Sequence, residues 1–181
     1  MNQLKEEDII LDEKEYKKRI DADIQKINKK RKVYSRRILR EIKSNKESKQ
    51  YEFRVIDDTH WLFIFTVPHG IYKGQTHQIK MKLIYGQHPH KKIYPCDAPL
   101  CSFTTPIWHP NISLGGTICL DTLTEQWSPC MNTSSVIQTI KLLLECPDPS
   151  SPMNREAAEQ YKNSREEYYI KVKEYYVKGP N

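Results

Sequence analysis

Three apolar runs between residues 51 and 85 constrain the fold more than any other part of the sequence. Residues 51–56 (YEFRVI) and 76–85 (THQIKMKLIY) alternate between apolar and polar side chains, and residues 61–67 (WLFIFTV) are nearly all β-branched or aromatic. Alternation with a period of two is typical of strands with one buried face. Because the links at 57–60 and 68–74 are short, we predict that the runs form antiparallel strands of a meander.

A helix and a fourth strand flank this meander. Residues 35–46 (SRRILREIKSNK) carry an apolar face made of Ile38, Leu39 and Ile42, and Ser35 is a candidate N-cap. Residues 86–99 contain three prolines and no periodicity, which indicates a loop. Residues 100–108 are predicted to form the fourth strand, which leads into a long loop.

Helical signals dominate the rest of the chain. One helix is predicted from Asn132 or Thr133 to Glu145, and a second over 155–161 after Asn154 as its cap. A capping box formed by Ser164 and Glu167 opens a last helix that reaches about residue 178. The order predicts an α+β fold with an N-terminal helix, a four-stranded antiparallel sheet and C-terminal helices on one side.

Length and composition suit one domain with an appendage. The chain has 181 residues, of which 29% are charged, and its mean hydropathy is −0.75. We assign residues 1–33 to a charged N-terminal extension, partly helical or disordered, and residues 34–181 to the main domain. The start of the chain is too polar and acidic for a signal peptide, and no apolar run approaches a membrane span. We therefore expect a cytoplasmic or nuclear protein with no membrane partner.

The positive charge is concentrated near the N-terminus. Residues 1–50 hold 16 Lys and Arg against 10 Asp and Glu, whereas residues 51–181 hold 13 of each. Part of the excess lies on the predicted helix at 35–46. Two explanations remain open at this point: a solvated helix surface, or a contact surface for an acidic partner.

A cysteine in an unusual setting is the main candidate for chemistry. The five cysteines follow no CxxC spacing, and we expect free thiols that mostly fill the core. Cys119, however, follows a Gly-Gly turn and lies eight residues after Asn111 of a His-Pro-Asn sequence, with Asp121 close behind. A thiolate is a good acyl carrier, and an asparagine amide can stabilise an oxyanion. A buried packing cysteine and a cysteine protease that uses His109 are the alternatives, although no protease signature surrounds Cys119.

The same residues resemble a known family. HPN, the Cys of ICLD eight residues later, and Trp127 followed by SP are similar to the core signature of ubiquitin-conjugating enzymes. The likeness extends through SVIQTIKLLLECPDPSSPMNREAAEQYKNSREEYY and the N-terminal RRILREI, and covers about residues 34–178. The resemblance implies the ubiquitin-conjugating fold, in which the long loop is the active-site loop.

The resemblance also implies roles for individual residues. Cys119 would receive the carboxyl end of ubiquitin, or of a ubiquitin-like modifier, as a thioester from an activating enzyme and pass it to a substrate lysine. Asn111 would stabilise the oxyanion or brace the loop, and Asp121 would lie near the incoming lysine. His109 and Pro110 would shape the turn. The predicted activating-enzyme contacts are Arg36, Arg37 and Arg40, and the predicted ligase contacts are Cys96, Pro129 and Cys130.

Two positions depart from the family pattern. Ser151 stands where an acidic residue is common at the gate for the incoming lysine, and Cys96 replaces a usual Phe on the ligase-facing loop. The loop at 86–92 is also longer than usual. These changes suggest a divergent member, or one dedicated to a ubiquitin-like modifier.

Other functions are less consistent with the sequence. His88, His90, Cys96 and Cys101 match no standard zinc spacing, so we expect neither a metal nor a cofactor. A non-catalytic ubiquitin-binding adaptor would lack the cysteine. A nucleic-acid-binding module would use the basic region at 29–43, but the predicted sheet lacks exposed aromatic pairs. We expect a monomer that works with ubiquitin, an activating enzyme, a ligase and substrate proteins.

Overall fold

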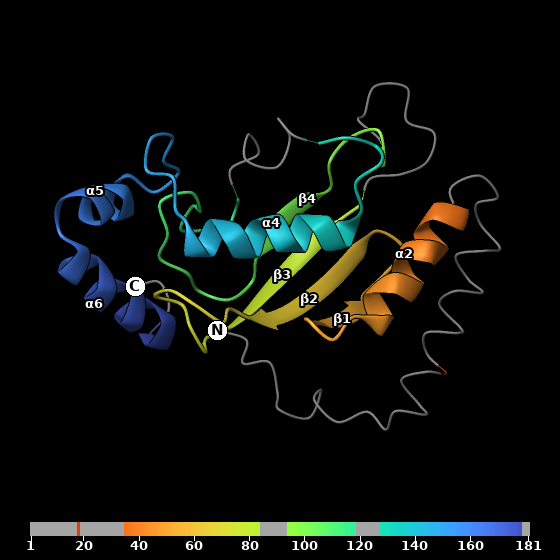
Figure 1. The fold of residues 1–181 in the computed structure, drawn as a ribbon, viewed down its shortest axis with the longest axis horizontal. Coiled ribbons are helices and arrows are strands. Elements are labelled where there is room, and N and C mark those ends of the chain that lie inside the picture. Colours follow the sequence, from red (N-terminus) through yellow and green to blue (C-terminus); the bar gives the residue numbers. More distant parts are fainter. Residues whose placement is uncertain (1–17, 19–34, 84–93, 119–126, 179–181) are drawn as a thin grey trace.

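A computed structural model describes residues 18, 35–83, 94–118 and 127–178. These residues form an antiparallel sheet with α-helices around it (Figure 1). The predicted extension at 1–33 lies outside the described residues except for Lys18, so the predicted boundary at residue 34 stays a prediction. No helix in the described part of the chain is both long and apolar enough to cross a bilayer.

The sheet is a simple meander, as the apolar runs predict. Strands β1 (Glu52–Val55), β2 (His60–Thr66), β3 (Thr76–Lys82) and β4 (Leu100–Phe103) pair antiparallel in the order β1-β2-β3-β4. Phe53 lies opposite Phe63, and Ile79 lies opposite Phe103. The alternating side chains on one face are buried, because the period of two places every second residue against the helices.

The fourth strand is shorter than predicted. We expected it to run through residue 108, but β4 ends at Phe103. The backbone N–H of Phe103 donates to the carbonyl of Gly116 at 2.8 Å, so the later segment pairs with the outer edge of β4. Pro106 follows and has no N–H to continue a ladder. Ile107 and Trp108 are buried in an irregular segment, so their apolar character reflects burial and not strand structure.

The helices begin close to the predicted positions. They are α2 (Ser35–Glu47), α4 (Thr133–Glu145), α5 (Arg155–Asn163) and α6 (Arg165–Lys178). Asn132 is the N-cap of α4, and its side chain accepts the N–H of Ser135 at 2.8 Å. Helix α5 extends two residues beyond the predicted end.

Ser164 joins α5 to α6, and the predicted capping box is only half formed there. Its Oγ accepts the N–H of Glu167 at 3.3 Å, as expected for the start of α6. Its own N–H donates to the carbonyl of Gln160 at 2.9 Å and closes α5. The N–H that Glu167 would have bound is therefore already used by the preceding helix.

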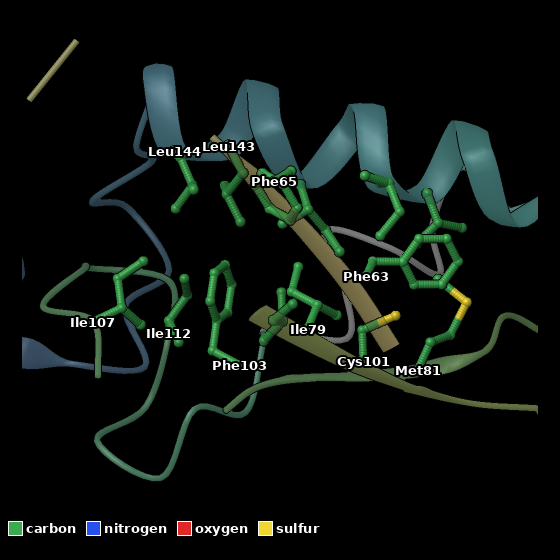
Figure 2. Close-up of a cluster of buried hydrophobic side chains, with 14 of the residues drawn as sticks. Phe63, Phe65, Ile79, Met81, Cys101, Phe103, Ile107, Ile112, Leu143 and Leu144 are labelled. Carbon is green, nitrogen blue, oxygen red and sulfur yellow. The ribbon is translucent and has the colours of Figure 1, made fainter. Parts of the chain in front are cut away.

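The helices surround one core. Helix α4 crosses one face of the sheet, while α5 and α6 lie together beyond one end of it and α2 lies toward the other (Figure 1). The prediction of helices on one side thus describes α4 best. Apolar side chains of the sheet, the segment after β4 and α4 meet in the core shown in Figure 2, where the labelled residues are Phe63, Phe65, Ile79, Met81, Cys101, Phe103, Ile107, Ile112, Leu143 and Leu144.

Candidate functional site

His109 is completely buried and bonded through both ring nitrogens. Its Nε2 lies 3.0 Å from the carbonyl of Leu143 near the end of α4, and its Nδ1 accepts the N–H of Asn111 at 3.0 Å. A carbonyl can only accept, so Nε2 carries the proton and Nδ1 does not. Burial lowers the pKa of His109 to about 4, which keeps the ring neutral. Neither nitrogen is left to activate a thiol, which argues against the cysteine protease alternative.

Asn111 connects the same turn to the Pro-rich segment 147–152. Its Oδ1 accepts the N–H of Asp148 at 2.9 Å, and its Nδ2 donates to the carbonyls of Asp148 at 2.6 Å and of Ser151 at 3.4 Å. The side chain is 2% exposed. All polar atoms of the amide are thus engaged with one loop, which is the bracing geometry that we expected as one of two roles for this residue.

The carbonyl of Pro110 completes this connection. It accepts the N–H groups of Met153 at 2.8 Å and Asn154 at 2.9 Å. Asn154 is in turn the N-cap of α5, where its Oδ1 accepts the N–H of Ala157. His109, Pro110 and Asn111 therefore fix the end of α4, the Pro-rich segment and the start of α5 relative to one another. We call these three residues the HPN clamp.

The glycine turn leads back toward the sheet. Gly116 has φ of +81°, and a Cβ built there would lie 2.2 Å from the carbonyl oxygen of Phe103. Only glycine fits such a close approach. Ile118, the last described residue before the gap, is buried and forms an isolated bridge with Ile112. Cys119 and Asp121 lie outside the described residues.

The four described cysteines differ in their environments. Cys101 is buried in β4, and burial raises the pKa of its thiol to about 12, so it stays protonated. Cys96, Cys130 and Cys146 are exposed. The expectation that the cysteines mostly fill the core is wrong for these three, because two lie on loops and one caps the end of α4.

Ser151 lies in the Pro-rich segment that the HPN clamp holds. The residue is exposed, and its carbonyl accepts from Asn111. Asp148 in the same segment accepts hydrogen bonds from the N–H and Oγ of Ser150, and these bonds lower the pKa of its carboxyl. The structure thus brings Ser151 and Asn111 together.

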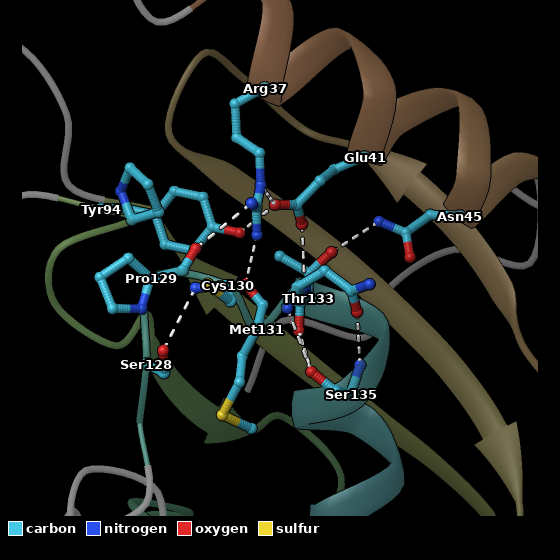
Figure 3. A network of polar contacts seen from close by, with 12 residues as sticks. Arg37, Glu41, Asn45, Tyr94, Ser128, Pro129, Cys130, Met131, Thr133 and Ser135 are labelled. Atoms are coloured by element: carbon cyan, nitrogen blue, oxygen red, sulfur yellow. Dashed lines mark hydrogen bonds and ion pairs between the residues drawn. The ribbon is translucent and has the colours of Figure 1, made fainter.

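The three arginines of α2 have different surroundings. Arg36 and Arg40 are exposed. Arg37 is partly buried, and its guanidinium binds Glu41 and the carbonyls of Pro129 and Met131 (Figure 3). Two of the predicted partner contacts therefore face solvent, whereas Arg37 is bonded within its own chain.

The predicted ligase contacts come from two loops that lie against each other. Cys96 is exposed on one, and Pro129 and Cys130 are exposed on the other. Trp127 joins them, because its Nε1 donates to the carbonyl of Pro95 at 2.9 Å and its ring lies 5.8 Å from that of Tyr94. Trp127 and Pro95, which are 32 positions apart in the sequence, thus hold the two loops together.

Glu41 is the residue of this region that sequence patterns did not reveal. It is 4% exposed although it lies in a highly charged helix. Its carboxylate binds Arg37, Tyr94 and the N–H of Thr133. The one available signal was that it is the only acidic residue among the basic positions 36–43.

The zinc alternative gains no support from the part of the chain that the structure describes. No group of three or more His, Cys, Asp or Glu side chains there could hold a metal ion. Of the four residues considered, Cys101 is buried in the core, Cys96 is exposed, and His88 and His90 lie outside the described ranges.

Comparison with known proteins identifies the family. The sequence model described as ubiquitin-conjugating enzyme matches residues 37–176, a stretch that contains the HPN clamp and Cys119. The chain belongs to the ubiquitin-conjugating enzyme family. The predicted family and its α+β fold are thereby confirmed.

Individual relatives agree with this family. Ubiquitin-conjugating enzyme E2 27 of Arabidopsis thaliana is 40% identical over 100 residues, which cover 53% of this chain and 48% of that protein. The match thus spans about half the length of this relative. A crystal structure assigned to a ubiquitin-conjugating enzyme from Plasmodium yoelii superposes with a TM-score of 0.70 at 27% identity, covering 82% of this chain and 96% of that one.

Proposed function

We propose that the chain is an active ubiquitin-conjugating enzyme that carries ubiquitin, or a ubiquitin-like modifier, as a thioester on Cys119. The observation that carries the proposal is the family match through the segment that contains both the HPN clamp and Cys119. Ile118, the last described residue before Cys119, is buried and bridges Ile112, which directly follows the clamp. A precisely held neighbour is what a nucleophile needs in order to meet its partner in a defined geometry.

The proposed reaction has two acyl transfers. The thiolate of Cys119 attacks the thioester carbonyl presented by the activating enzyme, whose own thiol leaves. The ε-amine of a substrate lysine then attacks the new thioester, so that a C–N bond forms, the C–S bond breaks and the amine loses a proton. ATP is used upstream by the activating enzyme, and neither step at Cys119 needs a metal or a cofactor.

Asn111 has two proposed duties that its geometry makes compatible. Its Nδ2 donates to the carbonyl of Asp148 at 2.6 Å but only at 3.4 Å to that of Ser151. The longer bond is the weaker one. In the proposed transition state, Nδ2 exchanges the carbonyl of Ser151 for the oxyanion and keeps its bond to Asp148. Asp121 and Ser151 are proposed to border the path of the incoming lysine.

The proposed partners follow the exposed surfaces. Arg36 and Arg40 on α2 are proposed to meet the activating enzyme, and Cys96, Pro129 and Cys130 to meet a ligase. We propose that the protein works as a monomer in the cytoplasm or nucleus, without nucleic acid or membrane.

A charging assay tests this function. The protein is incubated with an activating enzyme, ATP and ubiquitin, and separated without reductant; parallel reactions use ubiquitin-like modifiers with their own activating enzymes. We expect one added modifier that thiols remove, no adduct in Cys119→Ala and a reductant-stable adduct in Cys119→Ser. The matched controls Cys96→Ser, Cys130→Ser and Cys146→Ser change other exposed thiols and should still be charged. If no modifier charges the wild-type protein, the enzymatic function is wrong and the adaptor alternative gains support.

A further inference from the structure

We propose that Arg37 and Glu41 are positioning residues that hold the two predicted ligase-facing loops in one arrangement. The proposal rests on the proposed function, and it changes the role of Arg37 from a partner contact to an internal support. We call Arg37, Glu41 and Tyr94 the loop hub, and it is shown in Figure 3.

The Glu41 carboxylate joins three parts of the chain. One oxygen accepts from Nε of Arg37 at 2.5 Å and from the hydroxyl of Tyr94, and the other accepts the N–H of Thr133 at 2.8 Å. A buried carboxylate is costly unless charged or polar donors surround it. The fold therefore keeps α2, the Tyr94 loop and the start of α4 together around this one group.

Arg37 extends the hub to the second loop. Its Nη1 donates to the carbonyl of Pro129 at 3.3 Å and its Nη2 to that of Met131, while Nε stays on Glu41. The planar guanidinium spreads its donors in several directions, which the single ammonium of lysine does not do. Arg37 can thus fix the path of residues 129–131 with a geometry that a conservative change to lysine removes.

The two loops are also bonded to each other. Trp127 donates to the carbonyl of Pro95, and the Tyr94 ring packs against the Trp127 ring. The exposed residues Cys96, Pro129 and Cys130 lie on these loops, whereas Glu41 is 4% exposed. A partner that binds the surface therefore cannot contact Glu41 appreciably, yet its binding surface depends on Glu41.

The test compares two hub variants with matched controls. Glu41→Gln keeps the size of the side chain but places an amide N–H where only acceptors fit, and Glu47→Gln makes the same change at an exposed position of α2. Arg37→Lys keeps the charge, and Arg155→Lys is its exposed control on α5. Because Glu41→Gln can destabilise the fold, Arg37→Lys keeps the test valid if the first variant does not fold.

Amide hydrogen exchange and Trp127 quenching measure the loops directly. We expect the amides of residues 127, 128, 130 and 131 to exchange about ten-fold faster in the hub variants than in their controls, because hydrogen bonds that close local openings are lost. Acrylamide should quench Trp127 more strongly. Unchanged exchange in a folded hub variant overturns the proposal.

The functional readout separates this proposal from the proposed function. The charged wild-type protein is discharged onto free lysine with increasing amounts of the RING domain that stimulates it most. We expect the hub variants to form the thioester as fast as the controls and to reach the same maximal rate of discharge. The concentration of RING domain that gives half of this maximal rate should be about ten-fold higher for the hub variants. If variants and controls need the same concentration of RING domain, the positioning role is wrong. If the wild type is not charged, the proposed function is wrong. If no RING domain stimulates the wild type, the exchange result alone decides.

Discussion

Asn111 and the backbone of Asp148 bind each other through two hydrogen bonds, with Oδ1 accepting the Asp148 N–H at 2.9 Å and Nδ2 donating to the Asp148 carbonyl at 2.6 Å. The two residues are 37 positions apart in the sequence. This pairing fixes the orientation of the Asn111 amide and joins the segment that precedes Cys119 to the loop that carries Ser151. It explains why an asparagine, which is both donor and acceptor, suits this position.

Asn111→Asp tests the pairing. A carboxylate would present an oxygen to the carbonyls of Asp148 and Ser151 in place of a donor, so we expect the free energy of unfolding to fall by about 1–3 kcal/mol. Urea unfolding at pH 7 measures it. Asn163→Asp, at the exposed end of α5, is the control and should change stability little. If both variants unfold alike, the amide does not make these bonds in solution.

The two adjacent glycines should differ sharply when each is replaced by alanine. A Cβ at Gly116 would lie 2.2 Å from the carbonyl oxygen of Phe103, and the residue also has a positive φ, whereas the nearest atom to a Cβ at Gly115 is 3.8 Å away. We expect Gly116→Ala to lower the free energy of unfolding by about 3 kcal/mol or more, and Gly115→Ala to lower it by less than about 1 kcal/mol. Thermal unfolding of the two variants compares them. Similar melting temperatures would contradict the close packing of Gly116 against β4.

Two buried histidines should make stability depend on pH. His77 has no hydrogen-bond partner among the residues that the structure describes and lies against rings that include Phe65 and Tyr72. Burial lowers its pKa to about 4. The pKa of His109 is likewise about 4. In the unfolded chain both titrate near 6.5, so between pH 6.5 and 4 the unfolded state binds more protons. The contribution of the two neutral histidines to stability is therefore fully present above pH 6.5. The free energy of unfolding should fall as the pH drops toward 4, by up to about 1.4 kcal/mol per pH unit for each histidine.

His77→Phe removes one of these groups and keeps an aromatic ring in the same place. We expect its stability to fall less steeply than that of the wild type between pH 6.5 and 4, as measured by urea unfolding at several pH values. Parallel curves for the two proteins would show that His77 is not buried as a neutral ring.

The described cysteines should divide by reactivity. In Cys119→Ala, we expect Cys96, Cys130 and Cys146 to react with a thiol reagent in the native state, because they are exposed. Cys101 is buried, with its pKa raised to about 12, and should react only after denaturation. Mass spectrometry of the labelled protein locates each modification. Rapid native labelling of Cys101 would contradict its place in the core.

Local signals were enough to predict most elements. The alternation at 76–85 places Ile79, Met81 and Leu83 inside, and all three are fully buried. Asn132 caps α4 as its side chain predicts, because capping bonds reach only to the next turn. The HPN sequence and Cys119 were also visible in the sequence, together with the family that they resemble.

Bonds between distant segments were not predictable from such signals. Pattern alone extends the fourth strand to residue 108, but β4 ends at Phe103, whose N–H donates to the carbonyl of Gly116, and Ile107 and Trp108 are buried outside the sheet. Ser164 looked like the start of one helix, and its N–H also closes the helix before it. In both cases a backbone N–H that the local pattern left unassigned donates to a carbonyl of another segment.

By itself, the sequence determined the strands, the helices, their caps and the family, because each depends on residues close together or on a motif of fixed spacing. The tertiary structure decided that Arg37 supports a loop more than 90 residues away and that Glu41 is buried while the exposed arginines beside it face solvent. The sequence does not indicate whether the hydrogen-bonding groups of a charged side chain will bind water or other groups of the protein. That choice depends on which donors and acceptors the complete fold brings within hydrogen-bond distance.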